Sequence, residues 1–287
     1  MFPSQFAYHR PTTVSEVVAL LQGNPDAKLL AGGHSLLPAM RLRLAAPGAL
    51  VDLGRVDGLR GISANGAVRI GAMTTYQELE DSDELRARLP MIGETAHNVG
   101  DPQVQARGTL GGSLAHNDPA SDFTAVFLAL DGQVSVVGPT GERAIAADDL
   151  FVDLLTTSLT ADEVITEVAF PAMGERVGMA YEKHRHPASG YAVVGVAVVL
   201  TMGDGDICRS ARIAVTGATT TATRATGAEQ ALAGQSLTAE TIAAAVAAAP
   251  EGLELNGDHY ASAEYRRHLV TVFAKRVIET AAARARE

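Results

Sequence analysis

Cysteine is almost absent from the sequence: Cys208 is the only one among 287 residues. One thiol cannot form an internal disulfide, a structural zinc site built on cysteines, or an iron–sulfur cluster held by this chain alone. The sequence also lacks an H-E-x-x-H motif, and His184 and His186 precede Pro187 without a third ligand nearby. We therefore expect no metal site in this chain, a reducing compartment, and a buried, inert Cys208.

Long apolar runs and a basic surface are also lacking. The longest apolar run, Tyr191 to Leu200, has the length of a strand, whereas a membrane-spanning helix needs about 20 apolar residues. The N-terminal residues contain no apolar core of a secretory signal. With 23 basic and 33 acidic residues the net charge is −10, which disfavours nucleic acids and anionic membranes as partners. We expect a cytoplasmic protein with no transmembrane segment and no nucleic-acid partner.

The pattern of apolar residues divides the chain into three segments. Residues 1–56 combine a helix, capped by Thr13 and Glu16, with short strands in a βαβ-like unit. Residues 57–172 contain a hairpin signal at Asn65-Gly66 and further strands and helices. Residues 177–287 read as antiparallel strands followed by helices. This order predicts an α+β fold.

The middle segment contains a possible helix cap and a long stretch without regular periodicity. Thr74 and Gln77 have the spacing of a helix cap, and residues 100–118 show no regular periodicity. We expect a cap at Thr74 and a long irregular loop over residues 100–118. Irregular connections of that length in compact domains are often functional.

The first glycine motif is Ala31-Gly32-Gly33-His34-Ser35, between an expected strand at 27–30 and an expected helix at 36–44. Glycines let backbone N–H groups approach a ligand, and a helix start adds positive potential, which together suit a phosphate. An ordinary tight turn explains this motif about equally well on its own.

The second glycine motif, Gly108-Thr109-Leu110-Gly111-Gly112-Ser113, is followed by Asp118 and Asp122. Hydroxyl groups with a carboxylate suit a ribityl or ribose chain better than a second phosphate. A buried loop whose glycines serve only the backbone is the alternative. No G-x-G-x-x-G, G-x-x-x-x-G-K-[ST] or G-x-S-x-G motif is present, which disfavours a Rossmann site, a P-loop and a serine hydrolase.

Taken together, the two motifs resemble the FAD-binding medium subunit of molybdenum hydroxylases, the family of xanthine dehydrogenase. Within the family the similarity is greatest to the medium subunit of aerobic carbon monoxide dehydrogenase. It extends over the whole chain and includes Tyr8–Pro11, Ile70–Thr75, Tyr181–Lys183 and Ala263–Arg266.

The resemblance implies an FAD-binding PCMH-type fold: two α+β subdomains (1–56 and 57–172) with a C-terminal domain of antiparallel strands and helices (177–287). It implies non-covalent FAD and no catalytic or metal-ligating residue in this chain. Leu29 to Leu36 and Thr109 to Ser113 would hold the FAD, chiefly by its pyrophosphate. Asp122 would bond ribityl or neighbouring hydroxyls, and Tyr191 would lie against the isoalloxazine. Val99 would lie in the adjoining flavin-contact loop, and Ile165 and Lys183 would add contacts near the flavin. The implied cofactor-binding residues are Leu29, Leu30, Ala31, Gly32, Gly33, His34, Ser35, Leu36, Val99, Thr109, Leu110, Gly111, Gly112, Ser113, Asp118, Asp122, Ile165, Lys183 and Tyr191.

The implied function is electron transfer within a complex. A large subunit would hold the molybdenum cofactor, a small subunit two [2Fe–2S] clusters, and FAD on this chain would pass electrons to a quinone or another acceptor. The resemblance implies a dimer of heterotrimers in the cytoplasm, with the inner face of the membrane as a second location reached through the complex.

Two departures and two alternatives accompany this interpretation. Residues 184–187 read His-Arg-His-Pro where relatives tend to be rich in Lys and Arg, which leaves the acceptor open, and the loop 184–190 is expected to be mobile. The four-cysteine insertion of the hydroxybenzoyl-CoA reductase subunit is absent, so no additional cluster is expected. A self-contained PCMH-type flavin oxidoreductase and a non-enzymatic nucleotide-binding module are the alternatives.

Overall fold

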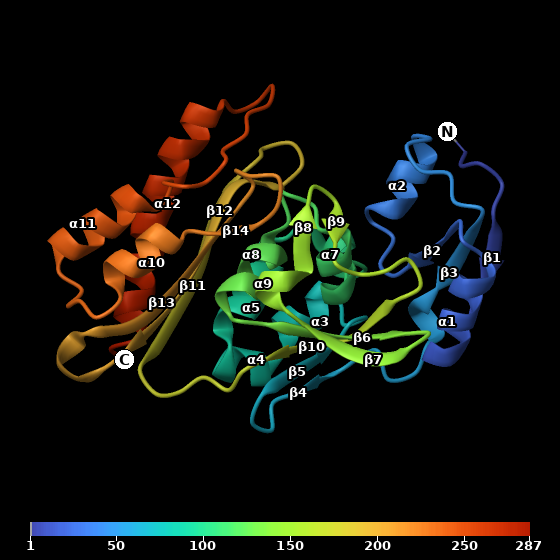
Figure 1. Ribbon diagram of the computed structural model, residues 1–287, viewed down its shortest axis with the longest axis horizontal. Helices are drawn as coiled ribbons and strands as arrows, with labels where there is room; N and C mark the ends of the chain where they lie inside the picture. Colours follow the sequence, from blue (N-terminus) through green and yellow to red (C-terminus); the bar gives the residue numbers. More distant parts are fainter. Residues whose placement is uncertain (1) are drawn as a thin grey trace.

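The computed structural model describes residues 2–287 and arranges them around three sheets that follow one another along the chain (Figure 1). The first sheet is parallel, in the order β1-β3-β2. Its strands are β1 (Ala7–His9), β2 (Ala27–Leu30) and β3 (Ala49–Asp52), with helices α1 (Val14–Gly23) and α2 (Leu36–Arg41). Because parallel strands end at one edge, the first glycine motif, which follows β2, lies at the carboxyl edge of this sheet.

Helix α1 forms as its sequence predicts. The Thr13 hydroxyl accepts a hydrogen bond from the backbone N–H of Glu16, and the Glu16 carboxylate accepts one from the backbone N–H of Thr13. Val17, Val18 and Leu21 form the buried face of α1 and pack with Val51 of β3 in one apolar cluster. The same cluster contains Ala27 of β2, the strand that leads into the first glycine motif.

The second sheet is antiparallel, in the order β4-β5-β10-β6-β7. Its strands are β4 (Ile62–Ser63), β5 (Val68–Gly71), β6 (Gln133–Gly138), β7 (Gly141–Ala146) and β10 (Val164–Phe170). The predicted hairpin is present: β4 pairs with β5 across Asn65-Gly66, and Gly66 has φ +93°. A small ribbon, β8 (Phe151–Asp153) with β9 (Thr156–Thr157), lies beside this sheet.

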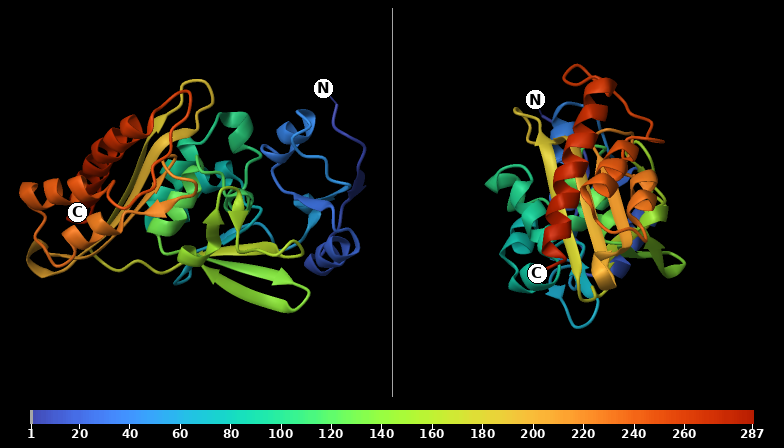
Figure 2. Two further views of the ribbon diagram at one scale, coloured as in Figure 1. Left: turned by 45° about the horizontal axis from the view of Figure 1, so that its top comes forward. Right: turned by 90° about the vertical axis from the view of Figure 1, so that its left-hand side faces the viewer.

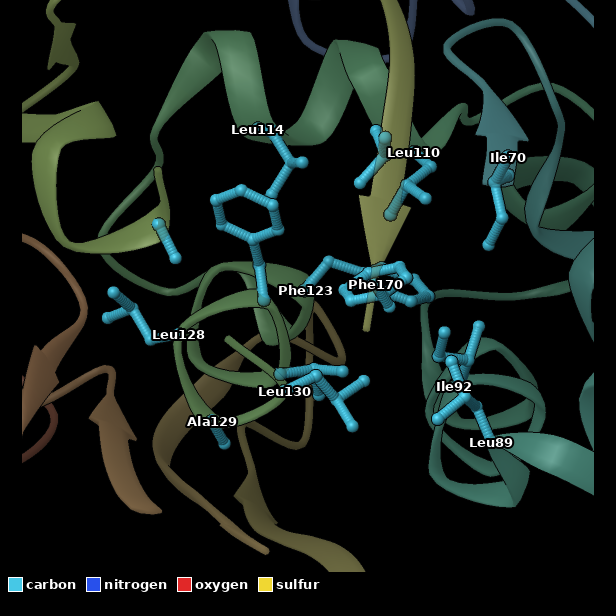
Figure 3. Packing of buried hydrophobic residues seen from close by; sticks show 14 of the residues in the cluster. Ile70, Leu89, Ile92, Leu110, Leu114, Phe123, Leu128, Ala129, Leu130 and Phe170 are labelled. Atoms are coloured by element: carbon cyan, nitrogen blue, oxygen red, sulfur yellow. The ribbon is translucent and has the colours of Figure 1, made fainter. Parts of the chain in front are cut away.

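Seven helices accompany the second sheet among the described residues. They are α3 (Tyr76–Asp81), α4 (Asp83–Arg88), α5 (Pro90–Asn98), α6 (Pro102–Gln105), α7 (Leu110–His116), α8 (Asp122–Ala129) and α9 (Ala147–Leu150). In Figure 3 the side chains of Leu110 and Leu114 point from α7 toward Phe123 and Phe170, in the core beneath it. Helix α7, which begins within the second glycine motif, is therefore anchored by apolar burial.

Two predictions for this region are wrong. The capping residue of α3 is Thr75 with Glu78, not Thr74 with Gln77, because Thr74 uses its hydroxyl to contact the backbone of Gly61. Residues 100–118 are also not irregular. They contain α6, capped by Asp101, and α7, capped by Thr109.

The third sheet has the order β11-β12-β13-β14, and its strands β11 (Val177–Arg185), β12 (Ala192–Met202) and β13 (Cys208–Thr216) form the predicted meander. The short strand β14 (Thr223–Arg224) completes it. Helices α10 (Thr226–Leu232), α11 (Ala239–Ala248) and α12 (Ala263–Arg284) cover one face, while α5 and α8 contact the other (Figures 1 and 2). Both faces of β12 are therefore covered, which explains its continuous apolar sequence. No helix among residues 2–287 combines the length and apolarity that crossing a bilayer requires.

Candidate functional site

The two glycine motifs, about 75 residues apart in sequence, lie against each other. A Cβ at Gly32 would overlap the carbonyl oxygen of Arg107, and a Cβ at Gly112 would lie 3.4 Å from Cβ of Ala31. The glycines thus allow the first and second sheets to approach each other through their backbones.

The first glycine motif presents unused hydrogen-bond donors. The backbone N–H groups of Gly33, His34 and Ser35 donate to no acceptor among residues 2–287. His34 and Ser35 are exposed, and Gly33 has φ +81°, a conformation that places successive N–H groups on one side of the chain. Such a concave arrangement of N–H groups suits an anion.

The second glycine motif differs from the first, because all but one of its backbone N–H groups, that of Thr109, already donate within the chain. The N–H of Leu110 donates to the carbonyl of Thr74 (3.1 Å), that of Gly111 to Ala72 (2.9 Å), and that of Gly112 to Oγ1 of Thr109 (3.2 Å). The hydroxyl of Ser113 lies 2.7 Å from that of Ser121. This motif supports the first one and offers side-chain hydroxyls together with the single N–H of Thr109.

A row of polar side chains on β11 connects the third sheet to the site. Tyr181, Lys183 and Arg185 alternate along the strand and therefore share one face. Nζ of Lys183 lies 2.8 Å from Oδ1 of Asp122 at the start of α8, and the Tyr181 hydroxyl donates to the same carboxylate. The side chains of Lys183 and Asp122 are each only 5% exposed, so the charges must compensate each other.

Burial dominates the electrostatics of this cluster. Burial raises the pKa of Asp122, and the neighbouring Lys183 and the Tyr181 hydroxyl oppose the increase. The pKa of Tyr181 lies well above its ordinary value because the phenol is buried and faces the Asp122 carboxylate. Tyr76, stacked on Phe123 at 5.1 Å between ring centroids, has its pKa raised to about 12, chiefly by burial. The carboxyl group of Asp122 and the phenols of Tyr181 and Tyr76 thus lie in a poorly hydrated region.

Arg185 contacts the loop that follows α5. One of its terminal nitrogens donates to the carbonyl oxygens of Asn98 and Gly100, each at 3.0 Å. Val99, half-buried, lies between these two carbonyls in sequence. Arg185 thereby joins the end of β11 to the second sheet's helices beside the expected contact residue Val99.

The tyrosine turn, His186 to Tyr191, connects β11 to β12 and is closed by backbone hydrogen bonds. The N–H of His186 donates to the carbonyl of Tyr191 (2.8 Å), and that of Gly190 to the carbonyl of His186 (2.9 Å). The Tyr191 side chain is 45% exposed. Its pKa is raised by partial burial and by the charge of Asp118, while the nearby Ser35 side chain opposes the increase. The phenol of Tyr191 therefore lies beside the first glycine motif.

Comparisons with known proteins identify the family. The model of the FAD binding domain in molybdopterin dehydrogenase matches residues 4–173, and that of the CO dehydrogenase flavoprotein C-terminal domain matches residues 179–281. The chain belongs to the FAD-binding family of molybdopterin dehydrogenases. It therefore has the FAD-binding fold of an oxidoreductase subunit.

Individual relatives agree over the full length of the chain. The carbon monoxide dehydrogenase medium chain of Hydrogenophaga pseudoflava is 41% identical over 286 residues, covering 99% of each chain. A solved structure of carbon monoxide dehydrogenase from that organism superposes with a TM-score of 0.96 over 99% of both chains at 42% identity. The nicotine 6-hydroxylase medium subunit of Paenarthrobacter nicotinovorans is 41% identical, covering 96% of this chain and 97% of that one.

The structure brings most of the expected FAD-contact residues to one region. The first motif with its flank at Leu29, the second motif, Asp118, Asp122, Lys183 and Tyr191 surround the junction between the three sheets. Ile165, by contrast, is 5% exposed and packs in the core of the second sheet. Among residues 2–287 no group of three or more His, Cys, Asp or Glu side chains is placed to hold a metal ion.

Sequence reasoning missed Tyr76, Tyr181 and Arg185. The signal for Tyr181 was available, because it alternates with Lys183 on a predicted strand. Arg185 was assigned to the expected loop 184–190, whereas the structure extends β11 to Arg185. Polar residues with a period of two on a strand that precedes a turn indicate a shared functional face. Tyr76 gave no such signal, since it only follows the capping residue of a helix.

Proposed function

We propose that this chain is the FAD-carrying medium subunit of a molybdenum hydroxylase of the carbon monoxide dehydrogenase type. The observation that carries the proposal is the set of unused N–H donors at Gly33, His34 and Ser35, held beside the second glycine motif. The diphosphate of FAD carries the negative charge that such donors bind. FAD therefore fits the residues present. Neither motif contains a lysine or an arginine, so backbone N–H groups would hold the diphosphate.

The residues of the site divide by the part of FAD they would contact. The first motif would bind the pyrophosphate, Asp118 and the hydroxyls of Thr109 and Ser113 the ribose or ribityl hydroxyls, and Tyr191 one face of the isoalloxazine. We propose non-covalent attachment, and the whole contact set is Leu29 to Leu36, Val99, Thr109 to Ser113, Asp118, Asp122, Ile165, Lys183 and Tyr191.

Bound FAD would supply the capacity to accept and release two electrons. The protein would orient it and exclude water from the ring. Tyr191 would cover one face of the isoalloxazine, while the buried cluster of Asp122, Lys183 and Tyr181 keeps the adjoining wall dry and neutral overall.

Partners complete the reaction. A chain with the single cysteine Cys208 cannot hold a [2Fe–2S] cluster, so two such clusters would lie on a small subunit and the molybdenum cofactor on a large one. We propose a dimer of heterotrimers that works in the cytoplasm or at the inner face of the membrane, with a quinone or another acceptor taking electrons from the reduced flavin. The domain boundaries 1–56, 57–172 and 177–287 belong to the same proposal.

Purification of the native complex tests the proposal. We expect this chain to co-purify with two other subunits and with FAD, molybdenum and about four iron atoms per FAD, as two [2Fe–2S] clusters require. Flavin on the chain without molybdenum and iron would indicate the self-contained oxidoreductase instead. No flavin in the complex would overturn the proposal.

A further inference from the structure

Resting on the proposed function, we infer that Lys183 is a positioning residue: its ammonium joins Asp122 to the carbonyl of Gly190 and so fixes the tyrosine turn that carries Tyr191. This role is separate from the direct FAD contact proposed above for Lys183, and the double-mutant cycle below distinguishes the two. Lys183 would act on the flavin through the place of the Tyr191 ring.

The contacts of Lys183 are those of a three-way junction. Nζ lies 2.8 Å from Oδ1 and 2.9 Å from Oδ2 of Asp122, and it donates to the carbonyl oxygen of Gly190 at 2.8 Å. An ammonium has three donors and no acceptor, so these partners account for its hydrogen-bonding capacity. Asp122 belongs to α8 of the second sheet's helices, whereas Gly190 belongs to the tyrosine turn between β11 and β12.

The geometry leaves the Tyr191 ring dependent on this junction. Gly190, the residue directly before Tyr191, has φ +75°, and its N–H and that of His186 close the turn. His186 also receives the N–H groups of Ala188 and Ser189 at Nδ1. The turn is thus internally ordered, and the Lys183 bond to Gly190 fixes it relative to α8.

A simple alternative is that the ion pair only stabilises the fold. Burying two charges is expensive, and removing one partner leaves the other uncompensated, so a single substitution cannot separate the two roles. The double variant Lys183→Met/Asp122→Asn removes both charges and leaves no unpaired ion. It still removes the donor to Gly190, which is the contact that matters here.

Hydrogen exchange of the full-length chain tests the junction directly. We expect the amides of residues 186–191 to exchange about tenfold faster or more in Lys183→Met/Asp122→Asn than in the wild type, because a charged donor to one carbonyl is lost. Amides within α8 and β12 should remain protected in this variant. Lys275→Met, at an exposed lysine of α12, is the matched control and should change neither.

Equal exchange of residues 186–191 in the double variant and the wild type, with the fold intact, overturns the inference. The measurement needs no bound flavin, so it remains informative if the chain binds no FAD. Absence of flavin contradicts the proposed function, whereas unchanged exchange contradicts only the role of Lys183.

A double-mutant cycle on the FAD-loaded chain tests the route through Tyr191. The visible flavin spectrum and the midpoint potential are measured for Lys183→Met/Asp122→Asn, for Tyr191→Ala, and for the two combined. If Lys183 acts through the ring, the shift caused by the charge-removing pair of substitutions should disappear in the Tyr191→Ala background. Additive shifts would show that Lys183 acts on the flavin independently of Tyr191 and would overturn the inference. Lys183→Arg, which retains a cation, should restore part of the wild-type exchange and spectrum.

Discussion

Gly32 and Arg107 face each other so closely that any side chain at Gly32 would overlap the Arg107 carbonyl oxygen. This glycine is required for packing of one motif on the other. At Gly33 the nearest atoms are flexible ends of Leu37 and Leu30, and its φ of +81° is the constraint. Neighbouring glycines of one motif therefore have different reasons to be glycine.

We predict that Gly33→Val abolishes FAD binding and leaves the fold largely intact. The side chain would stand among the free N–H donors and impose about 1–3 kcal/mol of backbone strain. Gly234→Val is the matched control, because Gly234 has φ +75° and no neighbouring atom within 4 Å of a Cβ. Flavin content and circular dichroism should be measured together. Wild-type flavin content in Gly33→Val would refute the assignment of the first motif.

Gly112→Val should also lose FAD, but with a larger effect on the fold. A Cβ there would lie 2.6 Å from the Thr109 hydroxyl that caps α7 and close to Ala31. We expect the apo-protein to unfold at a lower temperature than Gly33→Val apo-protein. Equal melting temperatures would indicate that the Thr109 cap adapts to the side chain.

Asp122→Ala is predicted to destabilise the apo-protein while weakening FAD binding less than Gly33→Val does. Loss of the carboxylate leaves Lys183 buried without its partner, which costs about 3–5 kcal/mol. Denaturant unfolding and FAD titration separate the two effects. A large loss of affinity without loss of stability would identify Asp122 as chiefly a ligand of FAD.

Lys183→Met should make stability depend more strongly on pH. Burial already raises the pKa of Asp122 from 3.8, and loss of the ammonium raises it further. The folded variant then holds a proton that the unfolded chain releases, so its stability falls as the pH rises above about 4. Urea unfolding at pH 5 and pH 8 should show a larger deficit relative to the wild type at pH 8. The opposite trend would contradict the assigned environment of Asp122.

Tyr191→Ala is predicted to keep FAD bound but to change its absorption spectrum and its rate of reoxidation. An aromatic ring on the isoalloxazine excludes water, which alters the potential more than the affinity. Tyr265→Ala is the control, since Tyr265 is similarly exposed (42%) and lies on α12 against His184. If the spectrum and the reoxidation rate both match the wild type, Tyr191 does not contact the flavin.

The thiol of Cys208 should be unreactive in the native protein. It is fully buried on β13, and burial raises its pKa to about 11. We expect no reaction with a disulfide reagent at pH 8 and one thiol per chain after denaturation. Rapid reaction of the native chain would mean that β13 opens readily.

Local patterns predicted the elements well where local chemistry decides them. The cap at Thr13, the hairpin at Asn65-Gly66, the strand 27–30 and the antiparallel strands at the start of residues 177–287 are found as predicted. The resemblance to molybdenum hydroxylase medium subunits is likewise confirmed by the family models.

Tertiary contacts explain what the sequence did not predict. Residues 100–118 contain glycines that lower helix propensity, but burial of Leu110 and Leu114 stabilises α7 despite them. The pairing of Asp122 with Lys183 joins residues 61 positions apart, a distance over which periodicity carries no information. The ribityl role expected for Asp122 remains a prediction, and its carboxylate already has two protein partners.

Residues from three sheets line the site, and each sheet is formed by a separate, successive segment of the chain. A ligand held at their junction binds only when all three sheets are folded. Its binding free energy therefore stabilises the three sheets together and makes their unfolding more cooperative. Thermal unfolding of the apo-protein should therefore be broad or split, and saturation with FAD should merge it into one sharper transition at higher temperature. The cofactor would then stabilise the folded chain as well as carry electrons.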